Sequence, residues 1–207
     1  MAFTFFFRDL HVLELIVRHA IPILASRSYA RVWDAGCAMG QEPYSLCILL
    51  AESMGRFAFN NLRILASDLD DCNLFGPIIA AGVYPWEEVE RMPPGILEKY
   101  FEPDEKPGHF RVKDTIRGRI TFQKHDLLSL QEIGQGLSLI VCKNVLLHLQ
   151  AAERVEVIRM FHRALTPGGY FAVEQTQDMP VEFRSLFERV VPDGRLYRKV
   201  EGSGCGS

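Results

Sequence analysis

The sequence has no cysteine pair of the kind that marks a disulfide framework or a structural metal site. Its five cysteines are an odd number and include no C-x-x-C spacing. Cys37, Cys47 and Cys142 lie in apolar runs, where a free thiol packs as a small hydrophobic group. We therefore expect a protein of a reducing compartment, the cytoplasm, with no metal site.

Long apolar runs are also absent. No stretch approaches the roughly 20 apolar residues that a membrane-spanning helix needs. Arg8 and Asp9 interrupt the apolar N-terminus, where a secretory signal would continue without charge. We expect neither membrane insertion nor secretion.

A strong net charge is missing as well. The formal net charge is −3 at pH 7, which gives the chain no overall attraction to nucleic acid. Residues 1–30 are locally basic, which fits either an acidic partner or a solvated helix face. The expected partner is therefore a protein acceptor or a small-molecule substrate, and the oligomeric state stays open.

The sequence does contain enough apolar material for one packed domain. It has 207 residues, of which 48% are hydrophobic and 24% charged, a composition typical of a single globular domain with a sizeable core. We assign residues 1–200 to this domain. Residues 201–207, which are mostly glycine and serine, are expected to form a flexible tail.

Apolar periodicity predicts alternating strands and helices. Strands are expected at 31–35, 62–67, 137–142 and 170–174. Helices are expected at 9–26, 43–54, 71–81, 95–101, 151–165 and 180–187. A hairpin is expected around Asp193-Gly194, between runs 187–191 and 195–200. This order predicts an α/β fold with a doubly wound parallel sheet and an antiparallel edge.

The segment 101–122 interrupts this alternation. Pro103, Pro107 and Gly108 precede two short alternating runs, 109–112 and 119–122. Alternation is typical of half-exposed strands. We therefore predict a small antiparallel ribbon that is inserted into the main sheet. Its basic residues are Arg111, Lys113, Arg117 and Arg119.

A glycine-containing turn follows the first predicted strand. Gly36 and Gly40 allow the backbone to pass close to a ligand, and a helix start at Pro43 offers free N–H groups. Asp68 follows the second predicted strand, where its two oxygens could accept both hydroxyls of a ribose. These features together predict a nucleoside cofactor at the carboxyl ends of parallel strands.

The same turn indicates which nucleoside. A dinucleotide loop usually reads G-x-G-x-x-G because a pyrophosphate sits on the helix end, but here Ala38 separates the two glycines and Glu42 follows. A carboxylate would repel a pyrophosphate and attract an amine or a sulfonium. S-adenosylmethionine carries both cations and no phosphate. The alternative for Glu42 is that it only complements the helix dipole.

Five short segments carry a further signal: Thr4-Phe5-Phe6-Phe7-Arg8-Asp9, the loop from Trp33 to Ser45, Ser67-Asp68-Leu69-Asp70, Cys142-Lys143-Asn144-Val145-Leu146 and Leu165-Thr166-Pro167-Gly168-Gly169. In this order and spacing they resemble the motifs of the CheR family, the S-adenosylmethionine-dependent methyltransferases that esterify glutamates of bacterial chemoreceptors. The family patterns are T-x-F-F-R-[DE], W-x-A-x-C-x-x-G-x-E-P-Y-S, [TS]-D-[IL]-D, C-R-N-V-L and L-x-P-G-G.

The resemblance implies a class I methyltransferase sheet, which is Rossmann-like and seven-stranded, with strand order 3-2-1-4-5-7-6. It also implies that the inserted ribbon can dock a peptide by strand addition. The cofactor-binding residues expected from the residues and the resemblance together are Thr4, Arg8, Gly36, Cys37, Gly40, Glu42, Asp68, Leu69, Asp126, Leu127, Asn144 and Val145.

The chain departs from the family at several positions. Only three residues precede the first motif, where the family usually has a helical N-terminal domain. His148 stands where the family has an active-site tyrosine. Glu174-Gln175-Thr176-Gln177 replaces the family's G-H-S-E, and Ala2 replaces an asparagine that lies two residues before the family's threonine. These departures leave the cofactor expectation unchanged and leave the methyl acceptor open.

The expected catalytic residues are Arg8 and His148. A glutamate carboxylate is ionised at neutral pH and needs no base, so Arg8 could hold one of its oxygens while the other attacks. Alternatively, Arg8 only pairs with Asp9. His148 could orient an acceptor, deprotonate a hydroxyl or amine, or be structural. Asp126 could meet the adenine amino group or be a loop acid.

Three functions are compatible with these residues. The first is transfer of a methyl group to glutamate side chains of a protein. The second is methyl transfer to a different small-molecule or peptide acceptor. The third is a cofactor-binding sensor or scaffold without turnover.

Overall fold

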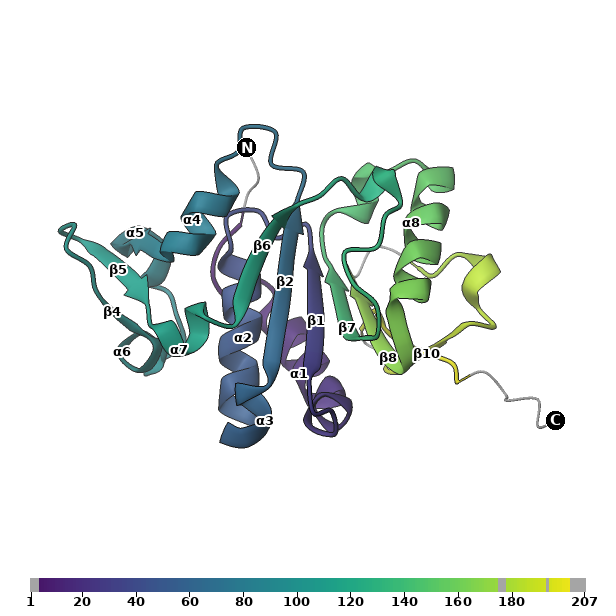
Figure 1. The fold of residues 1–207 in the computed structure, drawn as a ribbon, viewed down its shortest axis with the longest axis horizontal. Coiled ribbons are helices and arrows are strands. Elements are labelled where there is room, and N and C mark those ends of the chain that lie inside the picture. Colours follow the sequence, from purple (N-terminus) through teal and green to yellow (C-terminus); the bar gives the residue numbers. More distant parts are fainter. Residues whose placement is uncertain (1–3, 175–177, 193, 202–207) are drawn as a thin grey trace.

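The computed structural model describes residues 4–174, 178–192 and 194–201, and it is built on a seven-stranded sheet (Figure 1). The sheet has the order β6-β2-β1-β7-β8-β10-β9. Counting only its own strands along the chain, this order reads 3-2-1-4-5-7-6. The bounds are β1 Ala30–Ala35, β2 Leu62–Asp68, β6 Ile120–Lys124, β7 Leu137–Cys142, β8 Leu165–Val173, β9 Phe187–Arg189 and β10 Leu196–Lys199.

The strands from β6 to β8 run parallel to one another, and β10 is antiparallel to both β8 and β9. The predicted α/β sheet with an antiparallel edge is therefore confirmed. Parts of three predictions lie outside the described residues. These are Asp193 of the predicted turn, residues 175–177 and the tail residues 202–207.

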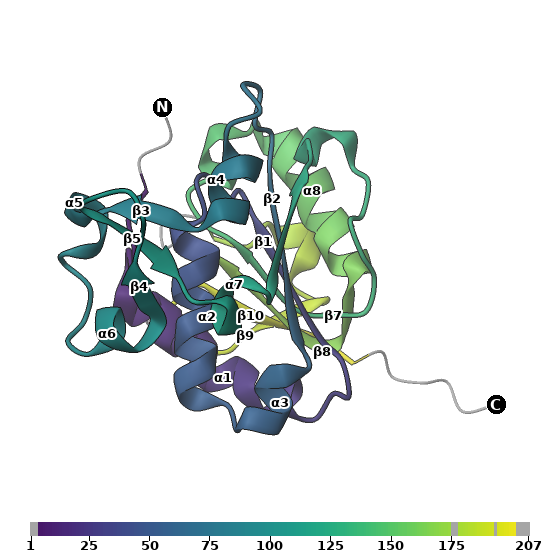
Figure 2. The same ribbon diagram turned by 60° about the vertical axis from the view of Figure 1, so that its left-hand side comes forward.

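Helices cover both faces of the sheet (Figures 1 and 2). Alternate strand residues such as Val32 and Ile64 pack with α1 Leu10–Ala25 and α2 Gln41–Ser53. The intervening residues face α8 Ala151–Ala164, where Trp33 meets Phe161 edge-on with ring centroids 5.0 Å apart. This alternation follows from the two-residue period of a strand. A short helix, α3 Arg56–Asn60, follows α2.

Two helices predicted from periodicity are shorter than expected. The helix predicted at 71–81 is α4 Phe75–Ala81, because the Asp70 carboxylate accepts the N–H groups of Leu74, Phe75 and Gly76 and so fixes the start of the helix. The helix predicted at 180–187 is only a 3₁₀ turn, Val181–Phe183, because Phe187 already belongs to β9.

A second, three-stranded antiparallel sheet has the order β3-β5-β4, with β3 Val83–Pro85, β4 Phe101–Pro103 and β5 His109–Val112. The predicted pairing of 109–112 with 119–122 is wrong, because 120–122 belong to β6 in the main sheet. Since β6 is an edge strand of that sheet, it shows the same half-exposed alternation as a ribbon.

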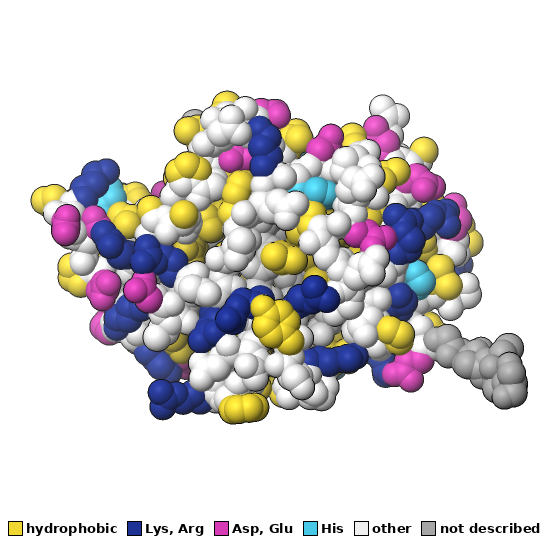
Figure 3. Space-filling model, in the orientation of Figure 1, with side chains coloured by type: hydrophobic (Ala, Val, Ile, Leu, Met, Phe, Trp, Pro, Cys, Tyr) yellow, Lys and Arg dark blue, Asp and Glu magenta, His cyan; other side chains and the backbone are white. Residues whose placement is uncertain are grey.

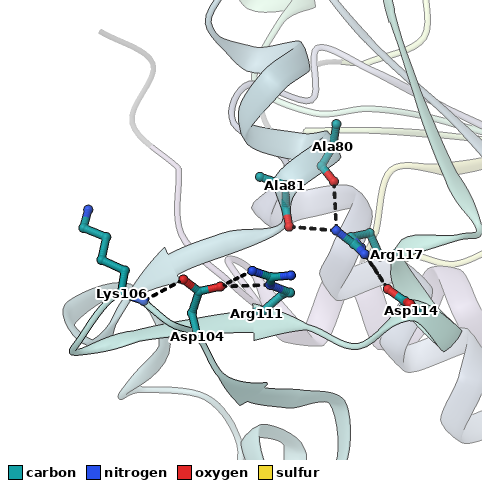
Figure 4. Close-up of polar contacts among 7 residues, drawn as sticks. All are labelled: Ala80, Ala81, Asp104, Lys106, Arg111, Asp114 and Arg117. Carbon is teal, nitrogen blue, oxygen red and sulfur yellow. Dashed lines mark hydrogen bonds and ion pairs between the residues drawn. The ribbon is translucent and has the colours of Figure 1, made fainter.

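The small sheet is linked by short helices and held by arginines. Arg111 donates two hydrogen bonds to Asp104, and Arg117 binds both Asp114 and the carbonyls of Ala80 and Ala81 at the end of α4 (Figure 4). The linking helices are α5 Trp86–Val89, α6 Ile96–Tyr100 and α7 Asp114–Arg117.

Within the described ranges, none of the helices has the length and apolar character that crossing a bilayer requires.

Candidate functional site

A cavity of about 630 Å³ opens at the carboxyl ends of β1, β2 and β7. That volume is typical of a small-molecule site. It brings together residues that are far apart in the sequence. Its lining consists of Thr4, Arg8, Gly36, Cys37, Ala38, Glu42, Ser67, Asp68, Leu69, His125, Asp126, Leu127, Leu128, Lys143, Asn144, Val145, Leu147, His148 and Leu149.

All predicted site residues line this cavity except Gly40. Gly40 has φ +97°, and a Cβ there would lie 2.7 Å from Ile79 Cγ1 and 2.9 Å from the Tyr84 hydroxyl. Gly40 therefore packs against the short elements beside the loop, and its contact with the cofactor stays a prediction. Its φ allows the chain to enter α2.

The turn after β1 is tied to the end of β2. The N–H groups of Gly36 and Cys37 donate to the Ser67 carbonyl at 2.7 and 3.0 Å. Gly36 has φ +95°, and a Cβ at this position would lie 2.1 Å from Val145 Cγ2. Only glycine fits both this conformation and this contact, so the turn lies directly against the segment after β7.

Asp68 ends β2 and faces the same turn. Its Oδ2 accepts the N–H of Ala38 at 2.9 Å. Ala38 has φ +47°, an unusual conformation for a residue with a side chain. The Asp68 carboxylate therefore both shapes the turn and lines the cavity.

Glu42 lies in the first turn of α2 and is bound by a lysine that the sequence interpretation missed. Lys143 Nζ lies 3.0 Å from Glu42 Oε2, 3.6 Å from Asp9 Oδ2 and 3.4 Å from the Arg8 carbonyl oxygen. The Lys143 side chain is only 2% exposed. Burial raises the pKa of the Glu42 carboxyl, and the nearby Lys143 opposes that rise.

The N-terminal segment is anchored beside the cavity by aromatic residues. The Phe6 ring packs edge-on against Tyr84 and Phe101, with centroids 4.9 and 5.6 Å apart. The Phe7 N–H donates to Ser45 Oγ at 2.8 Å. Phe6 and Phe7 are buried and form an apolar wall, whereas Phe5 is exposed.

This anchoring brings Arg8 to the end of β7. Arg8 Nη2 lies 3.4 Å from Asn144 Oδ1, and Arg8 Nε lies 3.9 Å from Asp9 Oδ2. Asn144 has φ +59°, and its N–H donates to Glu174 Oε2 at 3.1 Å. Both alternatives for Arg8 therefore have a geometric basis, because it contacts Asp9 and also lines the cavity.

Two predicted residues lie on short 3₁₀ turns at the mouth. His148 closes the turn Leu146–His148 and is exposed. Asp126 precedes the turn Leu127–Ser129, and its Oδ1 accepts the Leu128 N–H at 2.8 Å. Asp126 thus caps its own turn and also lines the cavity. No group of three metal-binding side chains occurs in the part of the chain that the structure describes.

Asp34 is a second buried ionisable group that the sequence interpretation missed. It lies in β1, is fully buried, and neither carboxyl oxygen has a hydrogen-bond partner among the described residues. Burial raises its pKa well above the usual range, and the charge of Glu42 adds to the rise. A buried acid without partners costs stability.

Replacing Asp34 with asparagine is expected to stabilise the protein. A carboxyl whose pKa rises on folding holds its proton more tightly in the folded state, so it destabilises that state increasingly as pH rises above the unfolded value of about 4. We expect Asp34→Asn to raise the free energy of unfolding by about 1–2 kcal/mol at pH 8 and by less at pH 4. Urea unfolding at both pH values measures this.

The exposed Asp71 provides the matched control for this substitution. Asp71→Asn should leave the free energy of unfolding unchanged at both pH values. A loss of stability in Asp34→Asn at pH 8 would contradict the expectation, because it would show that the Asp34 charge is favourable in the folded protein.

The family model and the similar sequences both point to the same protein family. A family model described as the S-adenosylmethionine-binding domain of CheR methyltransferases matches residues 2–193. A probable chemotaxis protein methyltransferase of Rhizobium etli is 27% identical over 194 residues, which cover 91% of this chain and 72% of that protein. Chemotaxis protein methyltransferase 1 of Pseudomonas aeruginosa is 31% identical, with 88% of this chain and 69% of that protein covered.

Among solved structures, the chain is similar to PKMT2 from Rickettsia typhi. The identity is 17% and the TM-score 0.49, and the match covers 84% of this chain and 26% of that one.

Proposed function

The chain belongs to the CheR methyltransferase family, and on this premise we propose that it transfers a methyl group to a glutamate carboxylate of a protein acceptor. Its cofactor is S-adenosylmethionine, and it is a methyltransferase of the CheR type. One observation carries the proposal: Glu42, Asp68 and Arg8 line a single cavity. We further propose that residues 1–200 act as one methyltransferase domain and that the acceptor is a chemoreceptor, as the names of the relatives suggest.

The cavity fits this cofactor in size and in chemistry. Its volume of about 630 Å³ suits a nucleoside with an amino-acid arm. We assign Asp68 to the ribose hydroxyls, Glu42 to the positively charged end and Asp126 to the adenine amino group. Thr4, Gly36, Cys37, Leu69, Leu127, Asn144 and Val145 complete the proposed cofactor-binding set.

Glu42 is suited to binding a cation because its carboxylate already pairs with one, the ammonium group of Lys143. Its carboxylate lies against Lys143 Nζ in a buried position. The ion pair favours the charged form of Glu42 although burial raises its pKa. A second cation entering the cavity would therefore meet a carboxylate whose position is already fixed.

The proposed chemistry requires positioning and needs no base. The bound cofactor supplies a methyl group on a sulfonium that is already activated for displacement. The acceptor carboxylate is ionised at neutral pH, so Arg8 would bind one of its oxygens and direct the other towards the methyl group. We assign His148, at the exposed mouth of the cavity, to orienting the acceptor.

Methyl-labelled cofactor tests the proposed acceptor. The purified chain is incubated with labelled S-adenosylmethionine and a fragment of a chemoreceptor, and the labelled protein is then treated with mild base. The proposal predicts label on the fragment that base releases as methanol, because carboxyl esters are base-labile. Base-stable label would indicate a different acceptor group. Cofactor binding without any label would indicate a protein that binds but does not turn over.

Replacing Asp68 with alanine is expected to weaken binding of S-adenosylhomocysteine. The loss of charge-assisted hydrogen bonds to the ribose should cost about 1–3 kcal/mol, or roughly 5- to 150-fold in affinity. Isothermal titration calorimetry measures this, with Asp71→Ala as the exposed control. Asp68→Asn retains an acceptor for the Ala38 N–H and should lose less. Unchanged affinity in Asp68→Ala would remove the ribose assignment.

A further inference from the structure

Three arginines form a row across the main sheet, at the opposite ends of the strands from the cavity. Arg31 of β1 and Arg63 of β2 are direct register partners. Arg119 precedes β6 at the same level, and its carbonyl accepts the N–H of Ile64 at 2.8 Å. By strand alternation all three share the face of Trp33 and Leu65, which is the face that α8 covers in part.

The positive charges in this row form no ion pair with the residues that the structure describes. Each guanidinium donates to neutral oxygens: Arg31 to the Gln135 carbonyl, Arg63 to the Leu62 carbonyl at 2.7 Å, and Arg119 to Asn60 Oδ1 at 3.0 Å. None of the ion pairs within the described residues includes any of the three. Like charges on neighbouring strands repel, so a bound anion would reduce the repulsion between the guanidinium groups.

Aromatic side chains accompany the row. Arg63 lies over the Tyr29 ring at 5.8 Å and Arg119 over the Phe59 ring at 5.5 Å. The Tyr29 side chain is 58% exposed. Figure 3 shows Lys and Arg side chains gathered across the lower part of this face with hydrophobic groups between them. Such a surface offers both positive charge and apolar contact.

We propose that the arginine row, with Tyr29, binds an acidic helical segment of a partner protein. Neighbouring strands lie about 4.8 Å apart, and side chains three or four residues apart on a helix have Cβ atoms about 5–6 Å apart. One face of an acidic helix can therefore place a carboxylate near each guanidinium. The exposed Tyr29 ring covers an apolar residue of such a helix.

The net charge of the chain favours a short acidic segment over a long polyanion. At −3 overall, the chain offers an extended nucleic acid no net attraction. A short segment meets only the local positive charge of the row. Because the row lies at the amino ends of the strands and the cavity at their carboxyl ends, the segment and the cofactor bind at the same time.

The test uses a fluorescein-labelled helical peptide with glutamates at every third or fourth position and leucines beside them. Binding to the full chain is measured by fluorescence anisotropy at about 50 and 300 mM salt. The triple variant Arg31→Gln, Arg63→Gln, Arg119→Gln is compared with Arg18→Gln, Arg91→Gln, Arg184→Gln, which changes the net charge equally at exposed positions elsewhere. S-adenosylhomocysteine affinity serves as the folding control for both.

We expect binding that weakens with salt, a loss of at least about tenfold in the first triple variant and little change in the second. S-adenosylhomocysteine affinity should be unchanged in both variants. Absence of peptide binding, or equal losses in the two triple variants, would overturn the proposal. If the first triple variant fails to fold, Arg63→Gln against Arg91→Gln makes the same comparison. Tighter binding of a labelled single-stranded RNA, lost in the first triple variant, would assign the row to nucleic acid instead.

Discussion

Replacing Arg8 with alanine is expected to lower the rate of methyl transfer about 100- to 1000-fold, the effect of removing one well-placed charged donor from a reaction centre. Arg8 lines the cavity and lies 3.4 Å from Asn144 Oδ1 at the end of β7, where it would align the acceptor carboxylate. Because its ion pair with Asp9 is long and partly exposed, the free energy of unfolding should change by less than about 1 kcal/mol. Single-turnover kinetics and urea unfolding measure the two quantities.

Two further variants separate alignment from charge. Arg8→Lys keeps the positive charge but loses the planar fork, so its rate should stay well below that of the unchanged protein. Arg18→Ala on the exposed face of α1 is the matched control and should change neither quantity. If Arg8→Ala loses stability in proportion to its rate, then Arg8 is structural and the proposed role is wrong.

Replacing Gly36 with alanine is expected to abolish most cofactor binding. The added Cβ would lie 2.1 Å from Val145 Cγ2, and φ +95° is a strained conformation for alanine. The turn and the segment after β7 must then move apart, although both line the cavity. We expect a loss of about 2–3 kcal/mol in the free energy of unfolding and at least about 100-fold in S-adenosylhomocysteine affinity.

The double variant Gly36→Ala, Val145→Ala tests the cause directly. Removing the valine methyl groups relieves the clash but not the backbone strain, so stability should return in part. Gly55→Ala is the control, because Gly55 has an ordinary φ of −62° and a Cβ there would have no other atom within 4 Å. Full affinity in Gly36→Ala alone would show that the loop tolerates a side chain and that the close approach is not required.

Much of the site was predictable because its residues follow strand ends. Parallel strands bring their carboxyl ends to one edge, so Asp68 at the end of β2 and Asn144 after β7 could be expected near the turn at Gly36. The ion pair of Lys143 with Glu42 could not be predicted, because 101 residues separate the two and a periodic pattern in the sequence shows only local contacts. Asp34 was missed for a related reason. It lies within an apolar strand, and only the structure shows that its carboxyl group is buried without a hydrogen-bond partner among the described residues.

The errors in the fold also have physical causes. The run 119–122 alternates because β6 is a half-covered edge strand, and alternation alone cannot distinguish such an edge from a separate ribbon. The strand β3 was missed because it has only three residues, Val83–Pro85, too few for a period.

A crystal structure of the chain with S-adenosylhomocysteine bound is the decisive measurement for the assignment of the cofactor site. We expect the ligand in the cavity at the ends of β1, β2 and β7, with Asp68 within hydrogen-bond distance of the ribose hydroxyls and Glu42 facing the positively charged amino group. A ligand bound elsewhere, or one held in this cavity with both carboxylates turned away from it, would show that the assignment is wrong.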